Sequence, residues 1–293
     1  MGAVATLKFI LSHPLNQGAK ISAFFRFVKW QIHSRLNGRP VIHPFTEKSR
    51  LVLRKGLTGA TGNLYCGLHE YADMAFLLHF LRREDFFADI GANVGSYTVL
   101  ASAHVGAQTF AFEPVPAAFA YLEENISLNQ IWGKVTVFNS ALGAQKGSIC
   151  FTHLLDSENR VALPDEADTI AVSVDTLDAV LPNGKIPILL KIDVEGYETE
   201  VLKGAEKTLS NPALKAIIIE INGSGKKYGC EEREIHQKLL QKGFLPYQYI
   251  PEKRSLMAME SFGPFNTLYV RDVTFIKNRL LTAETIKILG RAL

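Results

Sequence analysis

The sequence has little cysteine. Its 293 residues include three cysteines, Cys66, Cys150 and Cys230, which lie far apart and form no CxxC pair and no His-paired cluster. This scarcity speaks against a zinc site and against a disulfide framework. It favours buried thiols in a reducing compartment, so we expect a cytoplasmic protein. With 47% hydrophobic and 21% charged residues, the chain can build a globular core without such cross-links.

Long apolar runs are also missing. No stretch of the sequence has the length needed to cross a bilayer, and residues 1–12 lack the basic start and the small-residue cleavage site of a secretion signal. We therefore expect neither a membrane span nor an export signal. Internal repeats and low-complexity tracts are absent as well, which excludes solenoid and fibrous architectures.

The net charge of +3 is too small to indicate a nucleic-acid partner, and we expect none, but the charge is unevenly placed. Residues 1–60 hold ten Lys/Arg and one acid, a net +9, whereas the remaining chain holds 22 bases and 28 acids, a net −6. Within this segment the apolar residues of 21–32 recur at helical spacing. Such a basic helix could contact a membrane surface or pack across the acidic main domain, and we favour packing.

From Phe86 onward the pattern becomes regular. Short apolar runs alternate with segments of helical period, as expected for a parallel sheet that is covered by helices on both faces. The predicted strands are 86–90, 109–112, 135–138, 188–192 and 216–221, and the predicted helices are 94–104, 117–129, 198–210 and 231–242. Ahead of them we predict a β-ribbon near 50–65 and a helix over 71–81.

Two further strands, 244–250 and 266–270, follow one another with no helix between them, which predicts an antiparallel pair at the edge of the sheet. That ending is typical of a methyltransferase sheet and not of a dehydrogenase sheet. The chain thus divides into a basic helical N-terminal arm, residues 1–60, and a Rossmann-like α/β domain, residues 61–293, with a mostly parallel seven-stranded sheet. An insertion near 147–173 is expected to be rich in strands and close to the mouth of the site.

The sharpest local signal is the segment Asp-Ile-Gly-Ala-Asn-Val-Gly at 89–95, between a predicted strand and a helix. Gly91 and Gly95 allow a tight turn and a close approach of the backbone to a ligand, and Asp89 can accept hydrogen bonds from an amino group. This suits the amino-acid half of S-adenosylmethionine. A dinucleotide site would need a further glycine where Val94 stands, and an acid beside the turn would repel pyrophosphate.

The next two strands end in polar side chains as well. Glu113 ends the second strand, where a carboxylate can bind both ribose hydroxyls of a nucleoside. Ser140 follows the third strand, where a small polar side chain could meet the adenine. Each also has a local interpretation, Glu113 as a helix N-terminal acid and Ser140 as a turn residue.

Three acids follow the fourth strand in Lys-Ile-Asp-Val-Glu-Gly-Tyr-Glu at 191–198. Asp193 is expected near the reacting methyl group, and Glu195 could orient or deprotonate an acceptor hydroxyl. Lys191 lies within an apolar strand, so it either serves as a base with a lowered pKa or pairs with a neighbouring acid; a salt bridge is the expected arrangement. Glu220, at the end of the fifth strand, is a candidate for binding a substrate hydroxyl.

A divalent metal is an open alternative for lowering the pKa of the acceptor hydroxyl. Asp193 and Glu195 offer the oxygen ligands that Mg²⁺ accepts, but the sequence indicates no third ligand, so no metal site is assigned.

Together these segments resemble the FkbM family of methyltransferases. The resemblance rests on four blocks, residues 89–98, 112–114, 141–143 and 191–198, whose order and spacing match the family across 86–270. It implies a class I methyltransferase fold, S-adenosyl-L-methionine as methyl donor, and O-methylation of a hydroxyl in a small molecule, sugar or glycan.

By position, the resemblance also implies residue roles. It makes Asp89, Gly91, Asn93, Gly95 and Glu113 cofactor-binding residues, and it places Asp193 and Glu195 beside the reaction centre. Two other functions stay open: an NAD(P)-dependent oxidoreductase, and a non-catalytic interaction protein on the same fold.

Overall fold

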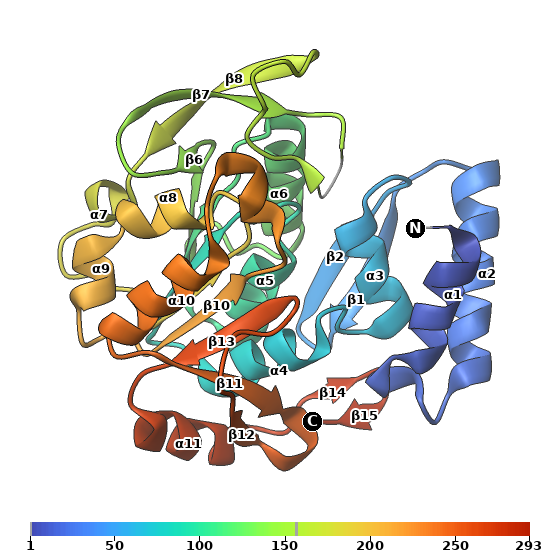
Figure 1. Ribbon diagram of the computed structural model, residues 1–293. Helices are drawn as coiled ribbons and strands as arrows, with labels where there is room; N and C mark the ends of the chain where they lie inside the picture. The colour runs from blue at the N-terminus through green and yellow to red at the C-terminus, as the bar shows by residue number, and fades with distance from the viewer. Residues whose placement is uncertain (1, 156–157) are drawn as a thin grey trace.

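The computed structural model describes residues 2–155 and 158–293; residues 156–157, within the predicted insertion, lie outside the described part. The main domain is built around one eight-stranded sheet, with helices on both of its faces (Figure 1). The predicted α/β class is therefore confirmed.

The sheet order is β12-β11-β13-β10-β9-β3-β4-β5. In chain order these strands are β3 (Phe86–Ile90), β4 (Gln108–Phe112), β5 (Val135–Phe138), β9 (Leu189–Ile192), β10 (Ala216–Glu220), β11 (Leu245–Ile250), β12 (Ser255–Ala258) and β13 (Asn266–Val270). The five neighbouring strands β10, β9, β3, β4 and β5 pair in parallel. Strand β13 lies between β10 and β11 and is antiparallel to both. This is the expected antiparallel ending.

The sheet has eight strands where seven were predicted. The additional strand β12 folds back on β11 as an antiparallel hairpin, after a turn at Pro251–Lys253. Its four residues are intermediate or exposed, and the prediction missed the short apolar run Leu-Met-Ala-Met at 256–259.

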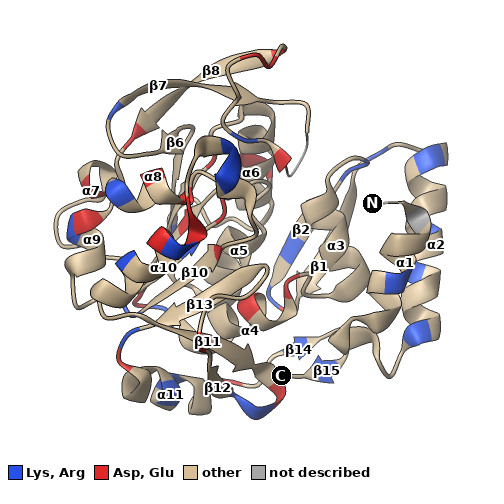
Figure 2. Ribbon diagram, in the orientation of Figure 1, with Lys and Arg blue, Asp and Glu red and all other residues tan. Residues whose placement is uncertain are grey.

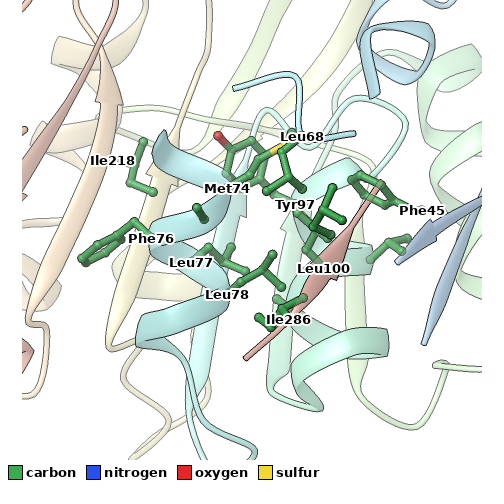
Figure 3. Packing of buried hydrophobic residues seen from close by; sticks show 14 of the residues in the cluster. Phe45, Leu68, Met74, Phe76, Leu77, Leu78, Tyr97, Leu100, Ile218 and Ile286 are labelled. Carbon is green, nitrogen blue, oxygen red and sulfur yellow. The ribbon is translucent and has the colours of Figure 1, made fainter. Parts of the chain in front are cut away.

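The sheet is apolar throughout because its two faces serve different cores. Along β10, Ala216 and Ile218 point into the core around α4 (Tyr71–Phe80), whereas Ile217 and Ile219 point into the core on the opposite face. Alternate residues of a strand face opposite sides, so a sheet covered on both sides needs apolar residues at every position. Figure 3 shows the first core, where Met74, Phe76 and Leu77 of α4 lie near Ile218, Tyr97 and Leu100.

The helices of the main domain largely match their predicted positions. They are α5 (Ser96–Val99), which continues as a π-helical segment over Leu100–Val105, then α6 (Pro116–Leu128), α7 (Leu177–Val180), α8 (Glu198–Lys203), α9 (Glu206–Ser210), α10 (Glu232–Gln241) and α11 (Val273–Leu281). The predicted helix 198–210 is divided into α8 and α9 at Gly204, whose Cα lies against the Gly143 carbonyl: a Cβ there would be 2.0 Å from that oxygen.

The N-terminal arm begins with α1 (Ala3–Ser12) and α2 (Lys20–Leu36), which lie side by side in Figure 1. A hairpin of β1 (Val41–Thr46) and β2 (Ser49–Leu53) and the helix α3 (Thr58–Cys66) follow. The predicted ribbon over 50–65 is thus wrong except at 50–53, because the hairpin lies earlier, over 41–53, and 58–66 is helical. Residues of α3 are buried against α2 and β2, and tertiary packing decides their conformation over weak local propensity. The predicted domain boundary at residue 60 falls inside α3.

Helix α2 packs on the protein, but not through the face that the sequence suggested. Its buried side chains are Ala23, Phe27, Trp30 and Ser34. The apolar residues that were expected to pack, including Ile21, Phe25 and Ile32, are exposed instead. The helix therefore carries two apolar faces, and the larger one lies outward.

The insertion is rich in strands, as predicted. Strands β6 (Ala141–Leu142), β7 (Gly147–Thr152) and β8 (Thr169–Asp175) form a small separate sheet in the order β6-β8-β7. At the other end of the molecule β14 (Lys287–Ile288) and β15 (Arg291–Ala292) form a short hairpin next to β1. Within the described residues, no helix combines the length and the hydropathy that a membrane crossing requires.

Candidate active site

A cavity of about 450 Å³ opens at the carboxyl ends of β3, β4, β9 and β10, the edge where open α/β sheets bind ligands. Its lining is strongly acidic. The carboxylates that line it are Glu70, Asp89, Glu113, Glu158, Asp193, Glu195 and Glu220. Lys191 is the only lysine or arginine among the described residues of this lining. Figure 2 shows acidic segments gathered inside the main domain, where these strands end.

The loop after β3 is shaped by the backbone of the loop after β9. Gly91 adopts φ +82, and a Cβ on it would lie 1.8 Å from the carbonyl oxygen of Asp193. Only glycine fits such an approach. The amides of Gly91 and Ala92 both donate to the Phe112 carbonyl, which ties this loop to the end of β4. The loop conformation is thus fixed from two neighbouring strands.

Asp89 lies at the base of this loop and is buried. Its Oδ2 accepts hydrogen bonds from the backbone amide of Thr98, at 2.9 Å, and from the Thr98 hydroxyl, at 2.6 Å. Both bonds use the same oxygen, so Oδ1 remains for a ligand. Burial raises the pKa of Asp89 to about 6, against the opposing effect of the Thr98 hydrogen bonds.

The Glu113 carboxylate connects the loop after β3 with the loop after β4. Its Oε2 accepts from the amide of Asn93 and its Oε1 from the amide of Val115, each at 2.8 Å. Burial raises the pKa of Glu113 to about 7, although these two backbone bonds act in the opposite direction. Each oxygen keeps a second lone pair, so the carboxylate can still accept from two hydroxyl groups.

The predicted cofactor residues do not all reach the cavity. Asp89, Gly91, Asn93 and Glu113 line it, whereas Gly95 and Ser140 do not. Gly95 precedes α5 in a left-handed conformation and packs against Leu122, so it shapes the turn. Ser140 is buried beside β6, where the chain leaves the main sheet for the insertion. Contact of Ser140 with a bound adenine is therefore not supported by this arrangement.

Lys191 is buried within β9 and forms an ion pair with Asp193, with 2.7 Å between Nζ and Oδ2. Nζ also lies 5.2 Å from the centre of the Tyr97 ring. Burial alone would lower the pKa of Lys191, but the carboxylates of Asp193 and Glu70 outweigh it and raise the pKa. Of the two roles predicted for Lys191, the structure thus favours the salt bridge over the base.

Glu195 and Glu220 complete an acidic cluster with Asp193. One carboxylate oxygen from each lies within 4.8 Å of the others. Burial, followed by repulsion from Asp193, raises the pKa of Glu195 to about 7, and the same causes raise the pKa of Glu220 well above its usual range. These three oxygens are also the ligand set that could hold a divalent cation, so tertiary structure supplies the third ligand that the sequence did not indicate.

Several lining residues were not predicted because they come from the arm and from the segment before β3. Thr6 and Phe9 of α1, residues 58–65 of α3, and His69 and Glu70 all line the cavity. The amide of Asn266, on β13, donates to Glu70 at 2.7 Å and to Asp73 at 3.0 Å. No local motif marks these positions, because they meet the site only through the packing of the arm.

The chain is similar to curated methyltransferases over about half of its length. A 148-residue stretch is 30% identical to the hexuronic acid methyltransferase AglP of Haloferax volcanii, covering 50% of this chain and 59% of AglP. The 31-O-demethyl-FK506 methyltransferase FkbM of Streptomyces tacrolimicus is 30% identical over 187 residues, covering 52% of this chain and 72% of that protein. The match to AglP thus spans less than two thirds of that protein's length.

A solved structure of a putative methyltransferase from Streptococcus mutans, in complex with S-adenosylhomocysteine, is a distant neighbour, with a TM-score of 0.41 and 14% identity over 68% of this chain and 94% of that one. The decisive match is to the model of the methyltransferase FkbM domain, which extends over residues 89–246 and so includes the loops after β3, β4 and β9. This chain belongs to the FkbM methyltransferase family.

Proposed function

We propose that the protein transfers a methyl group from S-adenosyl-L-methionine to a hydroxyl of a small molecule, sugar or glycan. One observation carries this proposal: the loops after β3, β4 and β9 bring Asp89, Glu113, Asp193 and Glu195 into one cavity. The first two carboxylates suit the amino group and the ribose of the cofactor. The other two lie where the acceptor would meet the methyl group.

The charge of the cavity supports this cofactor over a dinucleotide. Seven carboxylates and one lysine favour a ligand that carries a sulfonium and an ammonium group, as S-adenosylmethionine does. The pyrophosphate of NAD or NADP would meet repulsion at Asp89, beside the turn after β3. A non-catalytic protein on this fold would have no use for Asp193 and Glu195 in the same cavity.

The transfer is an in-line displacement. The acceptor oxygen attacks the methyl carbon as the carbon–sulfur bond breaks, and the hydroxyl proton leaves to a base. We assign that base to Glu195, because its pKa of about 7 lets it accept a proton near neutral pH. Asp193, held by Lys191, would orient the acceptor hydroxyl, and Glu220 would donate or accept a hydrogen bond beside it.

The arm and the insertion are proposed to determine which acceptor molecule binds. Both contribute to the wall of the cavity, with Thr6 and Phe9 from α1 and Phe151 and Glu158 from the insertion. The acidic lining favours a neutral or cationic acceptor. The three thiols are free, although only Cys66 is buried as expected and Cys150 is exposed. Free thiols support a reducing, cytoplasmic location.

Calorimetric titration of the full chain with S-adenosylhomocysteine, NAD and NADP tests the cofactor class. We expect binding of S-adenosylhomocysteine alone, and loss of at least about tenfold in affinity in Asp89→Ala and Glu113→Ala, since each removes one charge-assisted contact. Glu84→Ala is the matched control, because Glu84 is an exposed acid just before β3, at the opposite end of that strand from the cavity. Binding of a nicotinamide nucleotide without S-adenosylhomocysteine would overturn the proposal.

A turnover assay with hydroxylated acceptors then separates an enzyme from an interaction protein. Adding a chelator to the same assay tests the cation. Activity that survives EDTA assigns the proton transfer to the carboxylates alone, and activity that is lost and then restored by Mg²⁺ places a cation on Asp193, Glu195 and Glu220.

A further inference from the structure

The outward side of α2 carries an apolar stripe. Ile21, Phe25, Val28, Ile32 and Leu36 follow each other at spacings of three and four residues and so lie on one face of the helix. The exposed fractions of Ile21, Phe25 and Leu36 are 76%, 63% and 78%. The fully buried residues of α2 lie on a different face. Within the stripe, Val28 is partly buried against the core, and the other four residues are exposed.

Basic residues border this stripe. Lys20, Lys29 and Arg35 of α2 are exposed, as are Lys8 of α1 and Arg39 just beyond α2. The first acid of the sequence is Glu47, so 46 residues pass without a negative side chain. None of the described carboxylates forms an ion pair with these five bases, and Figure 2 shows blue but no red segments on α1 and α2.

The neighbouring helix extends the surface. Val4, Leu7 and Leu11 of α1 line a shallow groove whose other walls include Lys8 and Lys20. Val4 is 84% exposed. Lys20 thus belongs both to this groove and to the start of the α2 stripe, so the two apolar strips form one continuous surface of α1 and α2.

We propose that the α1–α2 surface docks the protein on an anionic lipid bilayer. Residues such as Phe25 and Ile32 would enter the boundary between headgroups and acyl chains, while Lys20, Lys29 and Arg35 would contact lipid phosphates. Charge complementarity selects this occupant. An apolar stripe alone fits many partners. A stripe whose charged neighbours are all bases fits a bilayer, which has negative headgroups at its surface and an apolar interior.

The docking surface and the cavity use different residues. Thr6 and Phe9 of α1 line the cavity, whereas the stripe residues of α2 do not. The membrane would therefore be held at α1 and α2 without filling the site. The docking surface and the proposed methyl transfer can be tested independently, because they share none of the residues changed below.

Co-sedimentation of the full chain with vesicles tests the proposal. We expect the protein to pellet with phosphatidylcholine vesicles that contain about one third phosphatidylglycerol, to stay in the supernatant with phosphatidylcholine alone, and to be released by about 0.5 M salt. Equal binding to both kinds of vesicle, or no binding to either, would overturn it.

Two variants separate the apolar and the charged contributions. Phe25→Asp/Ile32→Asp should weaken vesicle binding by at least about tenfold, and so should Lys20→Glu/Lys29→Glu, which leaves the stripe intact. The matched control is Leu281→Asp/Met257→Asp, at exposed apolar positions on α11 and β12; it should bind as the wild type does. An unchanged thermal midpoint shows that each variant is folded.

Analytical ultracentrifugation without lipid tests the alternative that a second copy of this chain binds the α1–α2 surface. A monomer at all concentrations supports docking on lipid. A dimer that Phe25→Asp/Ile32→Asp dissociates, in a protein that binds no vesicles, would reassign the surface to self-association and overturn the proposal.

Discussion

The Nζ of Lys191 lies 2.7 Å from Oδ2 of Asp193, in a pair whose lysine side chain is 2% exposed and whose aspartate side chain is 31% exposed. The lysine approaches from inside the sheet and the aspartate faces the cavity. The positive charge is thereby placed beneath a cluster of carboxylates that would otherwise repel one another. Four predictions follow from this relationship and from the neighbouring geometry.

Replacing Lys191 with Met should lower kcat by about 10²-fold and shift the pH–rate profile to higher pH, because the carboxylates of Glu195 and Glu220 lose a nearby cation and keep their protons longer. Steady-state kinetics across pH measure both effects. Lys215→Met is the matched control, since Lys215 pairs with Asp272 at 3.0 Å away from the cavity. Equal kinetics in the two variants would contradict a role for Lys191 in the site.

Replacing Glu195 with Gln should lower kcat by about 10²- to 10⁴-fold while leaving the affinity for S-adenosylhomocysteine within about threefold of wild type. In the wild type the rate should rise with pH through about 7, as the raised pKa of Glu195 is passed and the carboxylate ionises. This rise of the rate with pH should be absent in the variant. Glu200→Gln, which breaks the pair with Lys203 outside the cavity, should keep the wild-type profile; a normal rate in Glu195→Gln would assign the base elsewhere.

Replacing Gly91 with Ala should destabilise the protein by about 3 kcal/mol or more, because the new Cβ meets the Asp193 carbonyl and the residue has φ +82. Gly56→Ala isolates the backbone contribution, since Gly56 has φ +93 and open space around its Cα. Urea unfolding of both variants measures the difference. If the two variants lose equal stability, the clash with the Asp193 loop contributes nothing.

The free energy of unfolding of Asp89→Asn, relative to that of wild type, should increase as pH rises from about 4 to about 6. Burial raises the pKa of Asp89 to about 6, so the folded protein holds this proton after the unfolded chain has lost it. The protonated Asp89 contributes its full stabilisation below the pKa that it has in the unfolded chain. This stabilisation is lost as pH rises through the pKa that Asp89 has in the folded protein. The difference should reach about 2–3 kcal/mol.

Chemical denaturation of wild type and Asp89→Asn at several pH values measures this effect. Using the difference between the two proteins removes the contribution of other titrating groups, such as the buried His79. Addition of S-adenosylmethionine should reverse the trend for the wild type above pH 6, because its ammonium group stabilises the ionised carboxylate. A difference that does not change with pH would show that Asp89 does not titrate in this range.

Local sequence patterns determined the main sheet and the loops at its carboxyl edge. Continuous apolar runs predicted β3, β4, β5, β9 and β10 to within a residue or two at each end, because a strand buried on both faces must be apolar at every position. The glycine-containing loop after β3 and the acids after β4 and β9 were predicted because their chemistry follows directly from the strand that precedes them.

Tertiary structure decided everything that depends on which distant segments meet. Glu220 joins Asp193 and Glu195 because β10 pairs with β9. Thr6 and Phe9 of α1 line the cavity because the arm packs against the main domain. These contacts join segments that no local pattern relates, whereas the Lys191–Asp193 ion pair joins residues two positions apart and was expected from the sequence. Ser140 does not line the cavity, and the chain leaves the main sheet there for the insertion.

The arm shows the same division. The sequence by itself determined that α2 is helical, basic and apolar, because spacing and charge are local properties. Which side of the helix is buried could not be read from that pattern, because α2 has one apolar face around Phe27 and Trp30 and another around Phe25 and Ile32. The hydrophobic effect can drive either face into an interior, and the fit against α1 and α3 selects the first and leaves the second exposed.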